Sequence, residues 1–290
     1  MWYVCGNFGQ DQAIDLVESV KNEMALADVK IEELADVRAV SLPAGTCLLI
    51  EQPLESKDND NSCCFSYYEV GQIDLKTKLV NQVVMQYLDE PFFDDLRTKQ
   101  QLGYVVFNRA DKNRGVTFNK FVVQSPGKSA EYLVNAINVF MLRLREEVKE
   151  ATQEDFDTQK KSVHTQLAEK AVNLTKDFEN MWPALEEHHY QFTRQEDSLK
   201  VLETVTLADF KAHFEKVFFS SEAKRLDFTV TSEKHKEDQE KDRQAYAEGE
   251  MFKIFKRETV TESIVAFKKQ SGLFPDVYKT NFYNQVSQRK

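Results

Sequence analysis

The sequence has few of the residues that make tight turns, with nine glycines and six prolines among 290 residues. Average soluble proteins contain about 12% of the two together. So small a supply argues against an all-β sandwich, which needs many short turns, and it favours long helices. Hydrophobic residues make up 41% of the chain and aromatic residues 11%. We therefore expect a packed core in one large domain or two smaller ones.

Basic side chains are also in the minority, 38 against 48 acidic ones, for a formal net charge of −10. Proteins that bind nucleic acid through its phosphates present a basic face, so nucleic acid is not the expected partner. No apolar run reaches the roughly 20 residues of a bilayer span. The first residues, Met1 to Gly6, lack the features of a secretory signal. We expect a soluble, cytoplasmic chain without a membrane partner.

Cysteine is scarce as well: Cys5, Cys47, Cys63 and Cys64 form neither a CxxC pair nor a dense disulfide framework. Reduced intracellular thiols are the favoured interpretation, with a structural disulfide as the alternative. Cys63 and Cys64 lie in a β-rich run with no histidine nearby in the sequence. They are therefore expected to be core residues rather than nucleophiles.

The first 36 residues are expected to form a short strand, Trp2–Cys5, followed by an acidic amphipathic helix. The apolar residues of this helix are Ala13, Ile14, Val17, Val20, Met24 and Leu26. One strand and one helix cannot bury a core alone. We therefore interpret residues 1–36 as the closing unit of a preceding domain, in a chain that is part of a longer protein.

Residues 37–290 alternate between strand and helix patterns, which predict an α+β domain with one antiparallel or mixed sheet and a helical layer on one face. Strands are expected at 38–42, 46–50, 63–70, 104–107, 116–124 and 226–231. Helices are expected at 74–88, 92–101, 129–149, 152–173, 175–192, 206–219 and 260–269. Pro91 is expected to open the second of these helices and Gly103 to end it. The highly charged residues 232–258 are expected to form a solvated connector.

Common catalytic motifs are missing. Neither HExxH nor HxxEH occurs, and none of the five histidines, His164, His188, His189, His213 and His235, has another at i+4. The cluster Glu186–His189 is better explained as a helical face, because adjacent helical residues point about 100° apart and cannot easily share one metal. No GxSxG elbow, P-loop or GxGxxG supports a nucleophilic hydrolase or a nucleotide-binding fold.

One segment is distinctive: it runs Leu96-Arg97-Thr98-Lys99-Gln100-Gln101-Leu102-Gly103-Tyr104-Val105-Val106-Phe107. It resembles the signature of the C-terminal half of the insulin-degrading enzyme (insulysin) family of M16 zinc metallopeptidases. Asn119–Ser125 and Val260–Pro275 are similar to further stretches of the same family. The resemblance implies that residues 1–36 end the third family domain and that residues 37–290 form nearly all of the fourth.

This resemblance implies a protease of two halves that close over a peptide chamber, with zinc held by HxxEH and a distal glutamate in the N-terminal half. The present chain would then contain none of the zinc ligands or the catalytic base, and would be inactive alone. The family motif assigns substrate binding and transition-state support to Arg97 and Tyr104. A guanidinium and a phenol can both donate hydrogen bonds to a substrate carbonyl and to its developing oxyanion.

Without the resemblance, Arg97 would be interpreted as a surface helix residue and Tyr104 as an edge-strand aromatic. Gly103 is expected to end the helix so that Tyr104 can start a strand. Asp94 and Asp95 are interpreted as partners of a helix-start dipole, and the pair Phe92–Phe93 as core.

The expected function is therefore the C-terminal, non-zinc-binding portion of an insulysin-type zinc metalloendopeptidase, which helps to bind peptides and to close the chamber. Peptide substrates and the N-terminal M16 half are the expected partners. The resemblance also implies a homodimer. Zinc is expected only in the full-length enzyme. The alternative is a non-catalytic M16-like module for peptide binding or subunit assembly.

Overall fold

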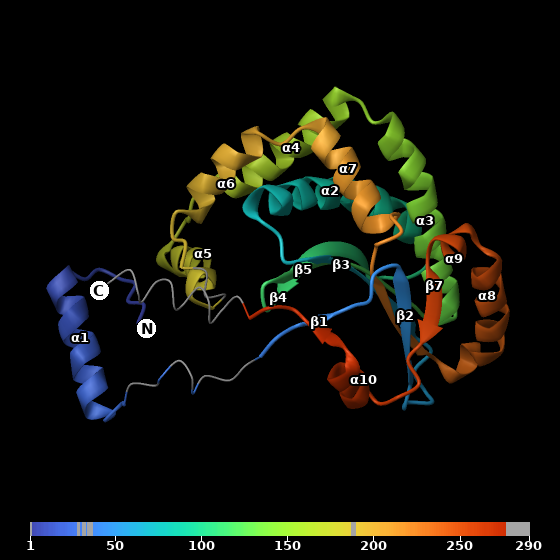
Figure 1. Cartoon of the computed structure of the whole chain (residues 1–290), viewed down its shortest axis with the longest axis horizontal. Helices are drawn as coiled ribbons and strands as arrows, with labels where there is room; N and C mark the ends of the chain where they lie inside the picture. The colour runs from blue at the N-terminus through green and yellow to red at the C-terminus, as the bar shows by residue number, and fades with distance from the viewer. Residues whose placement is uncertain (1, 28–29, 31–32, 34–36, 187–189, 277–290) are drawn as a thin grey trace. The chain divides into compact units, whose positions relative to one another are not determined.

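The computed structural model describes residues 2–27, 30, 33, 37–186 and 190–276. The chain divides into two compact units (Figure 1). The first is built mainly from Met1–Arg38 and Glu169–Arg194, and the second from Ala39–Ala168 and Gln195–Phe274. The first unit thus includes residues 169–194, which the sequence analysis placed in the C-terminal domain. The proposal that residues 1–36 close a preceding domain stays a prediction.

In its described residues the first unit contains two α-helices, α1 (Gln10–Glu23) and α5 (Leu174–Glu186). Helix α1 confirms the predicted acidic amphipathic helix, and none of its residues is buried. The expected strand at Trp2–Cys5 does not form: these residues have no regular secondary structure. The ring of Tyr3 instead lies 5.5 Å from that of Phe178 on α5, which stacks on Trp182.

The second unit is organised around a mixed sheet. Within the described residues its strands are ordered β4-β5-β3-β6-β2-β7. Their bounds are β2 Thr46–Pro53, β3 Ser62–Gly71, β4 Val106–Asn113, β5 Val116–Ser125, β6 Arg225–Thr231 and β7 Lys256–Thr259. The four strands from β4 to β6 pair antiparallel, whereas β2 pairs parallel with both β6 and β7. A separate short pair joins β1 (Val40–Ser41) to β8 (Gly272–Leu273).

Helices cover one face of this sheet (Figure 1). The principal ones are α2 (Leu75–Phe93), α3 (Ala130–Glu150) and α7 (Leu207–Phe218), with α4 (Gln153–Ala168) and α6 (Arg194–Glu203) above them. Side chains fix the helix starts: Asp74 accepts a hydrogen bond from the Thr77 amide, and Ser129 from the Tyr132 amide. The predicted class, α+β with a helical layer on one face, is confirmed. No helix in the described part of the chain is long and apolar enough to cross a membrane.

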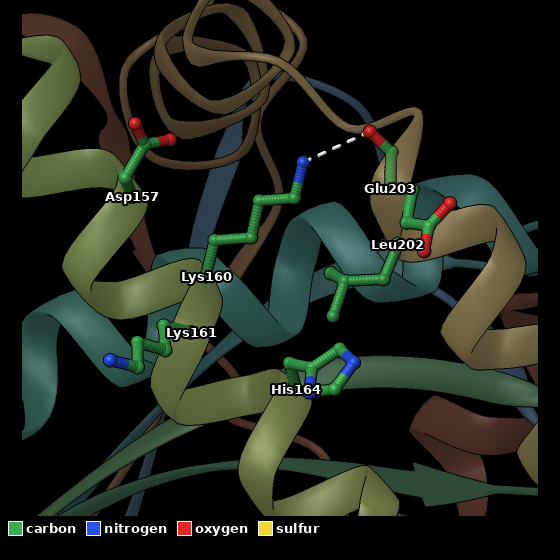
Figure 2. Close-up of a pocket in the computed structure, with 6 residues that line it drawn as sticks. All are labelled: Asp157, Lys160, Lys161, His164, Leu202 and Glu203. Carbon is green, nitrogen blue, oxygen red and sulfur yellow. Dashed lines mark hydrogen bonds between the residues drawn. The ribbon is translucent and has the colours of Figure 1, made fainter.

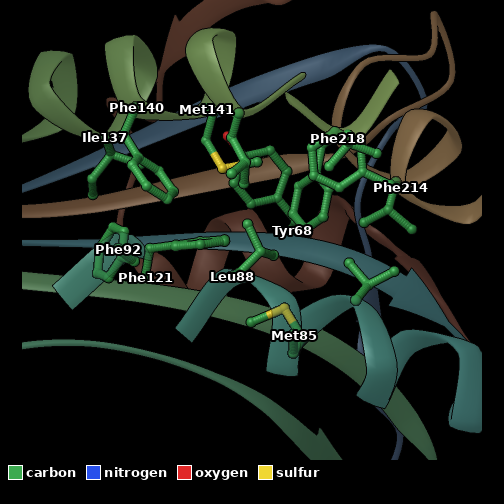
Figure 3. Close-up of a cluster of buried hydrophobic side chains, with 14 of the residues drawn as sticks. Tyr68, Met85, Leu88, Phe92, Phe121, Ile137, Phe140, Met141, Phe214 and Phe218 are labelled. Atoms are coloured by element: carbon green, nitrogen blue, oxygen red, sulfur yellow. The ribbon is translucent and has the colours of Figure 1, made fainter. Parts of the chain in front are cut away.

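The core lies between the sheet and these helices, and aromatic rings dominate it (Figure 3). The ring of Phe92 on α2 lies 5.3 Å from Phe121 on β5 and 5.2 Å from Phe140 on α3, both edge to face. Tyr68 on β3 contacts Phe218 on α7 at 4.9 Å. Such pairs stabilise a core beyond the area they bury. Helix α3, predicted at 129–149, buries an apolar stripe made of Leu133, Ala136, Ile137, Phe140, Leu144 and Val148.

Residues 232–258 are not the solvated connector expected from their charge. They form a short 3-10 turn (Glu233–His235), helices α8 (Lys236–Glu248) and α9 (Glu250–Ile254), and most of β7. Arg257 and Arg243 both bind Glu131, a fully buried carboxylate at the start of α3. The charges are thus used in ion pairs that attach this segment to the core. The last helix, α10 (Ile264–Gln270), agrees with the prediction.

Candidate functional site

The distinctive segment begins at the end of α2. The helix does not restart at Pro91, as the sequence predicted, but runs past it into a π-helical turn, η2 (Asp94–Lys99). Pro91 removes one amide donor, yet the Asp94 N–H still bonds to the carbonyls of Glu90 and Pro91, so the helix continues. The Gln100 N–H then donates to the Asp95 carbonyl at 2.9 Å. Such π turns inside helices occur frequently at functional sites.

Gln101, and not Gly103, reverses the chain after this turn. It takes a left-handed conformation with φ 53°, and the Leu102 N–H bonds back to the Leu96 carbonyl at 3.0 Å. Gly103 is required for a different reason, since a Cβ at this position would lie 1.9 Å from the backbone oxygen of Gln124 on β5. The glycine therefore allows two backbones to approach closely.

Tyr104 lies in a bend before β4, and the strand starts only at Val106. The expectation that Tyr104 begins a strand is therefore wrong. The carbonyl of Val105 accepts a bond from the Gln124 amide at 3.0 Å, which fixes this bend against β5. The phenol ring is 81% exposed.

The structure brings Arg97 and Tyr104 together. The guanidinium carbon of Arg97 lies 4.5 Å from the centre of the Tyr104 ring and 4.7 Å from that of Phe93. These are cation–π distances, so the two rings hold the arginine head between them. No described residue accepts a hydrogen bond from the side chain of Arg97 or Tyr104. Both side chains therefore have donors available to a ligand.

Phe93 is a site residue that the sequence analysis missed. It grouped Phe93 with Phe92 as core, but only Phe92 is fully buried, and Phe93 is 41% exposed. The available signal was the spacing, because residues four apart on a helix lie on the same face. Phe93 and Arg97 are separated in this way.

Neighbouring side chains fix the turn that carries Arg97. Leu96 is fully buried in the core. The buried carboxylate of Asp95 forms an ion pair with Arg143 on α3 at 3.0 Å. The exposed carboxylate of Asp94 forms one with Lys99 at 2.7 Å. The interpretation of Asp94 and Asp95 as helix-start residues is wrong, because they follow the continuous helix α2. The pair with buried Asp95 holds the π turn to α3, whereas the pair of Asp94 with Lys99 is exposed and contributes little.

The described residues do not fit a zinc site, since no three histidine, cysteine, aspartate or glutamate side chains among them gather around one point. His213 is buried and bonds to Asn81 at 2.9 Å, and burial lowers its pKa to about 4. His235 bonds to the Pro126 carbonyl. The cluster Glu186–His189 lies largely outside the described residues.

A shallow pocket of about 260 Å³ lies between α4 and α6 (Figure 2). Its lining residues are Asp157, Lys160, Lys161, His164, Leu202 and Glu203. Figure 2 shows Lys160 reaching the backbone of Glu203, whose carbonyl accepts a bond at 3.0 Å, and the same ammonium bonds to Val205. This lysine therefore satisfies the carbonyls at the end of α6. The pocket shares no residue with the Arg97–Tyr104 site.

All four cysteines are free thiols. Cys47 and Cys64 are fully buried, and burial raises the pKa of both thiols, which disfavours the nucleophilic thiolate. Cys63 is half-buried on the opposite face of β3. The interpretation of Cys63 and Cys64 as non-nucleophilic strand residues agrees with this geometry, although only Cys64 belongs to the core.

Sequence comparisons find a family model and several known proteins that match this segment. Residues 83–182 match the family model described as PQQ synthase PqqF-like, C-terminal lobe domain 4. Insulin-degrading enzyme of Drosophila melanogaster is 26% identical over 94% of the chain. A Schizosaccharomyces pombe protein named as a zinc protease, mug138, is 28% identical over 73% of it. The chain spans only 28% and 22% of the length of these two relatives.

Solved structures agree in fold. Pitrilysin superimposes with a TM-score of 0.71 over 93% of this chain and 27% of its own, at 14% identity. A peptidase M16 inactive domain from Pseudomonas fluorescens gives a TM-score of 0.57 over 78% of this chain and 51% of its own, at 15% identity. Sequence and fold together confirm the resemblance, carried by Leu96–Phe107, of this chain to the C-terminal region of M16 peptidases.

Proposed function

We propose that the chain is the C-terminal, non-zinc-binding portion of an insulysin-type zinc metalloendopeptidase, in which Arg97 and Tyr104 bind and orient the peptide while the domain closes the peptide chamber. The observation that carries this proposal is the exposed pair itself. Its donors have no partner among the described residues, and it lies inside the segment that matches the family model.

The geometry suits recognition of a peptide backbone. Phe93 and Tyr104 contact the Arg97 guanidinium through their ring faces, so the cation is held in place before a ligand arrives. A peptide carbonyl accepts hydrogen bonds from both guanidinium and phenol. Donors fixed in advance at a carbonyl that gains negative charge stabilise the transition state more than the ground state.

The zinc is assigned to the missing N-terminal half. A zinc protease is among the named relatives, and the described residues of this chain do not fit the metal. When bound there, zinc activates water and polarises the peptide carbonyl. The contribution of this chain is to position the peptide. Cytoplasmic location and homodimer formation stay predictions, with no interface residues assigned.

The test is reassembly of the enzyme from its two halves. Fluorogenic peptide cleavage by a zinc-bearing N-terminal half from the same source is measured with and without this chain. A zinc-dependent rise in rate is expected, and Tyr104→Phe should lower the kcat of the assembled enzyme about a hundredfold, the usual effect of removing one oxyanion donor. Arg97→Ala should lower kcat/KM to a similar extent.

Lys99→Ala is the matched control, because Lys99 lies in the same turn and pairs only with Asp94 among the described residues. It should leave turnover unchanged. Unchanged kcat/KM in both the Arg97 and the Tyr104 variant would refute their proposed role. If the halves associate but the rate does not rise, peptide binding or subunit assembly without catalysis becomes the better account.

A further inference from the structure

Gln101 reverses the chain between the π turn and β4 in a conformation that glycine adopts most easily. Its φ is 53°, and backbone bonds on both sides fix this conformation. The Gln100 amide donates to the Asp95 carbonyl at 2.9 Å, and the Leu102 amide to the Leu96 carbonyl at 3.0 Å. A left-handed residue with a Cβ is strained, whereas glycine in its place would not be. The glutamine side chain therefore makes this reversal less stable.

The side chain of Gln101 returns nothing to the fold. It is exposed, and it has no hydrogen bond among the described residues. The segment is instead held by Leu96 and Leu102, which are both buried in the core. Strained residues cluster at functional sites, where the rest of the structure holds them in place. An exposed amide without a structural use, on a strained residue next to the Arg97–Tyr104 pair, points to a ligand.

The position of Gln101 brings it close to this pair along the chain. Gln101 follows Arg97 by four residues, as Arg97 follows Phe93. A turn closed by bonds between residues five apart holds more than four residues, so residues four apart lie near the same side. The 4.7 Å contact of Arg97 with Phe93 agrees with this spacing. Gln101 also precedes Tyr104 by only three residues, so their Cα atoms are at most about 11 Å apart. An extended peptide covers that distance in about three residues.

The candidate site has donors for a peptide but lacks a free acceptor. A guanidinium only donates hydrogen bonds, and the proposed role of the Tyr104 phenol also uses its donor. The carboxylates of the same turn are already in ion pairs, Asp95 with Arg143 at 3.0 Å and Asp94 with Lys99 at 2.7 Å. Each peptide unit carries an N–H as well as a carbonyl, and an N–H that loses water without gaining a partner weakens binding. The side-chain oxygen of a glutamine is a neutral acceptor for such a group.

We propose that Gln101 is a further substrate-binding residue, whose side-chain oxygen accepts a hydrogen bond from a backbone N–H of the peptide held by Arg97 and Tyr104. This inference rests on the proposed function and adds the missing acceptor to that site. The three side chains together then bind both polar groups of the peptide backbone. Because they contact the backbone and not the substrate side chains, they favour no particular peptide sequence.

The first test is turnover by the enzyme assembled from its two halves. Gln101→Met keeps a side chain of similar length without the amide and should lower kcat/KM about tenfold. Gln100→Met is the matched control, because Gln100 is also an exposed glutamine but has an ordinary helical φ of −85°. It should leave kcat/KM unchanged. An unchanged kcat/KM in Gln101→Met, or an equal loss in Gln100→Met, would overturn the inference.

Gln101→Gly separates substrate binding from a structural role. Glycine removes the amide and also relieves the left-handed strain. This variant should therefore lose kcat/KM about tenfold, as Gln101→Met does, while the Tm of the chain is no lower than that of the parent. A residue that only supports the fold would lower Tm and turnover together. A Gln101→Gly chain that unfolds at a lower temperature would refute the argument from strain.

Ester substrates identify the group that Gln101 binds. The probe is a ten-residue fluorogenic peptide, made in versions that each replace one non-scissile backbone amide by an ester, which has no N–H. At least one version should be cleaved about tenfold less efficiently by the parent enzyme. The Gln101→Met enzyme should cleave that version as well as the all-amide peptide, because the N–H has already lost its partner. If Gln101→Met loses the same factor against every version, the acceptor role is wrong.

The same assay distinguishes failure of this inference from failure of the proposed function. If Tyr104→Phe and Arg97→Ala lower turnover and Gln101→Met does not, Gln101 is a turn residue only and the proposed function stands. If Gln101→Met lowers turnover and the other two variants do not, the roles of Arg97 and Tyr104 are wrong, and with them the premise of this inference. If combining the halves produces no zinc-dependent cleavage, the proposed function fails and the inference fails with it.

Discussion

Replacing Gly103 by alanine should damage both the stability of the sheet unit and the geometry of the site. The added Cβ would lie 1.9 Å from the backbone oxygen of Gln124 and 3.0 Å from its carbonyl carbon. The obstacle is backbone and not a flexible side chain. Gln124 is also paired with Cys63 on β3, so β5 is held on its other side. The segment around Gly103 must therefore move by about 1 Å or more.

That movement sets the expected magnitudes. Forcing an extra methyl group into a packed region costs about 1–3 kcal/mol. Losing the bond from the Gln124 amide to Val105 costs about 1 kcal/mol more. The free energy of unfolding should therefore fall by about 3 kcal/mol. A shift of about 1 Å in a positioning group can lower turnover about a hundredfold, and Tyr104 directly follows the substituted residue.

The assay combines urea unfolding of this chain with peptide turnover in the assembled enzyme. Gly127→Ala is the matched control, because no atom lies within 4 Å of a Cβ at that position. It should change the free energy of unfolding by less than about 0.5 kcal/mol and leave kcat/KM intact. If Gly103→Ala is as stable and as active as Gly127→Ala, the close approach of the two backbones does not constrain the site.

Three further substitutions test the structure. His213 has a pKa of about 4 against 6.5 for the ordinary group. The unfolded chain therefore binds more protons between these values, and stability that is complete above pH 6.5 should fall by about 3 kcal/mol as the pH drops to 4. His213→Gln should remove that part of the pH dependence of urea unfolding, and an unchanged slope would contradict it. Arg225→Met should lower the free energy of unfolding by about 3–5 kcal/mol, because it leaves the fully buried Asp227 carboxylate without the guanidinium that lies 2.8 Å away. Thermal unfolding indistinguishable from that of the parent chain would show that the pair is dispensable. Phe93→Ala should raise KM several-fold, because Arg97 loses a cation–π contact worth about 1 kcal/mol. Phe93→Tyr keeps an aromatic ring at this position and should have the KM of the parent enzyme. A raised KM in the Phe93→Tyr variant as well would show that Phe93 does not position Arg97.

Periodic features could be predicted from the sequence, because local spacing determines them. The helix predicted at 129–149 forms as α3, and the apolar residues spaced along one of its faces, from Leu133 to Val148, are buried. The segment 232–258 could not be predicted in the same way. Its charges look solvated until Glu131, more than a hundred residues earlier in the chain, is placed beside Arg243 and Arg257.

The same distinction applies to the site. The family motif selected Arg97 and Tyr104, and the structure places them in contact. It did not indicate the π turn or the left-handed Gln101, because neither depends on a characteristic residue type there. From the sequence, Gly103 was expected to end a helix. The structure requires glycine there because the backbone of β5, a strand later in the chain, lies too close for a Cβ.

The location of the site along the chain has a consequence for how the domain folds. Phe93, Arg97, Tyr104 and the backbone of Gln124 all belong to one continuous stretch that runs from α2 through the β4–β5 hairpin. Contacts between residues close in sequence form early and rapidly, whereas the pairing of β2 with β6 must close a loop of well over a hundred residues. The segment that carries Arg97 and Tyr104 should therefore take shape before the parallel half of the sheet is complete, during synthesis as well as in refolding.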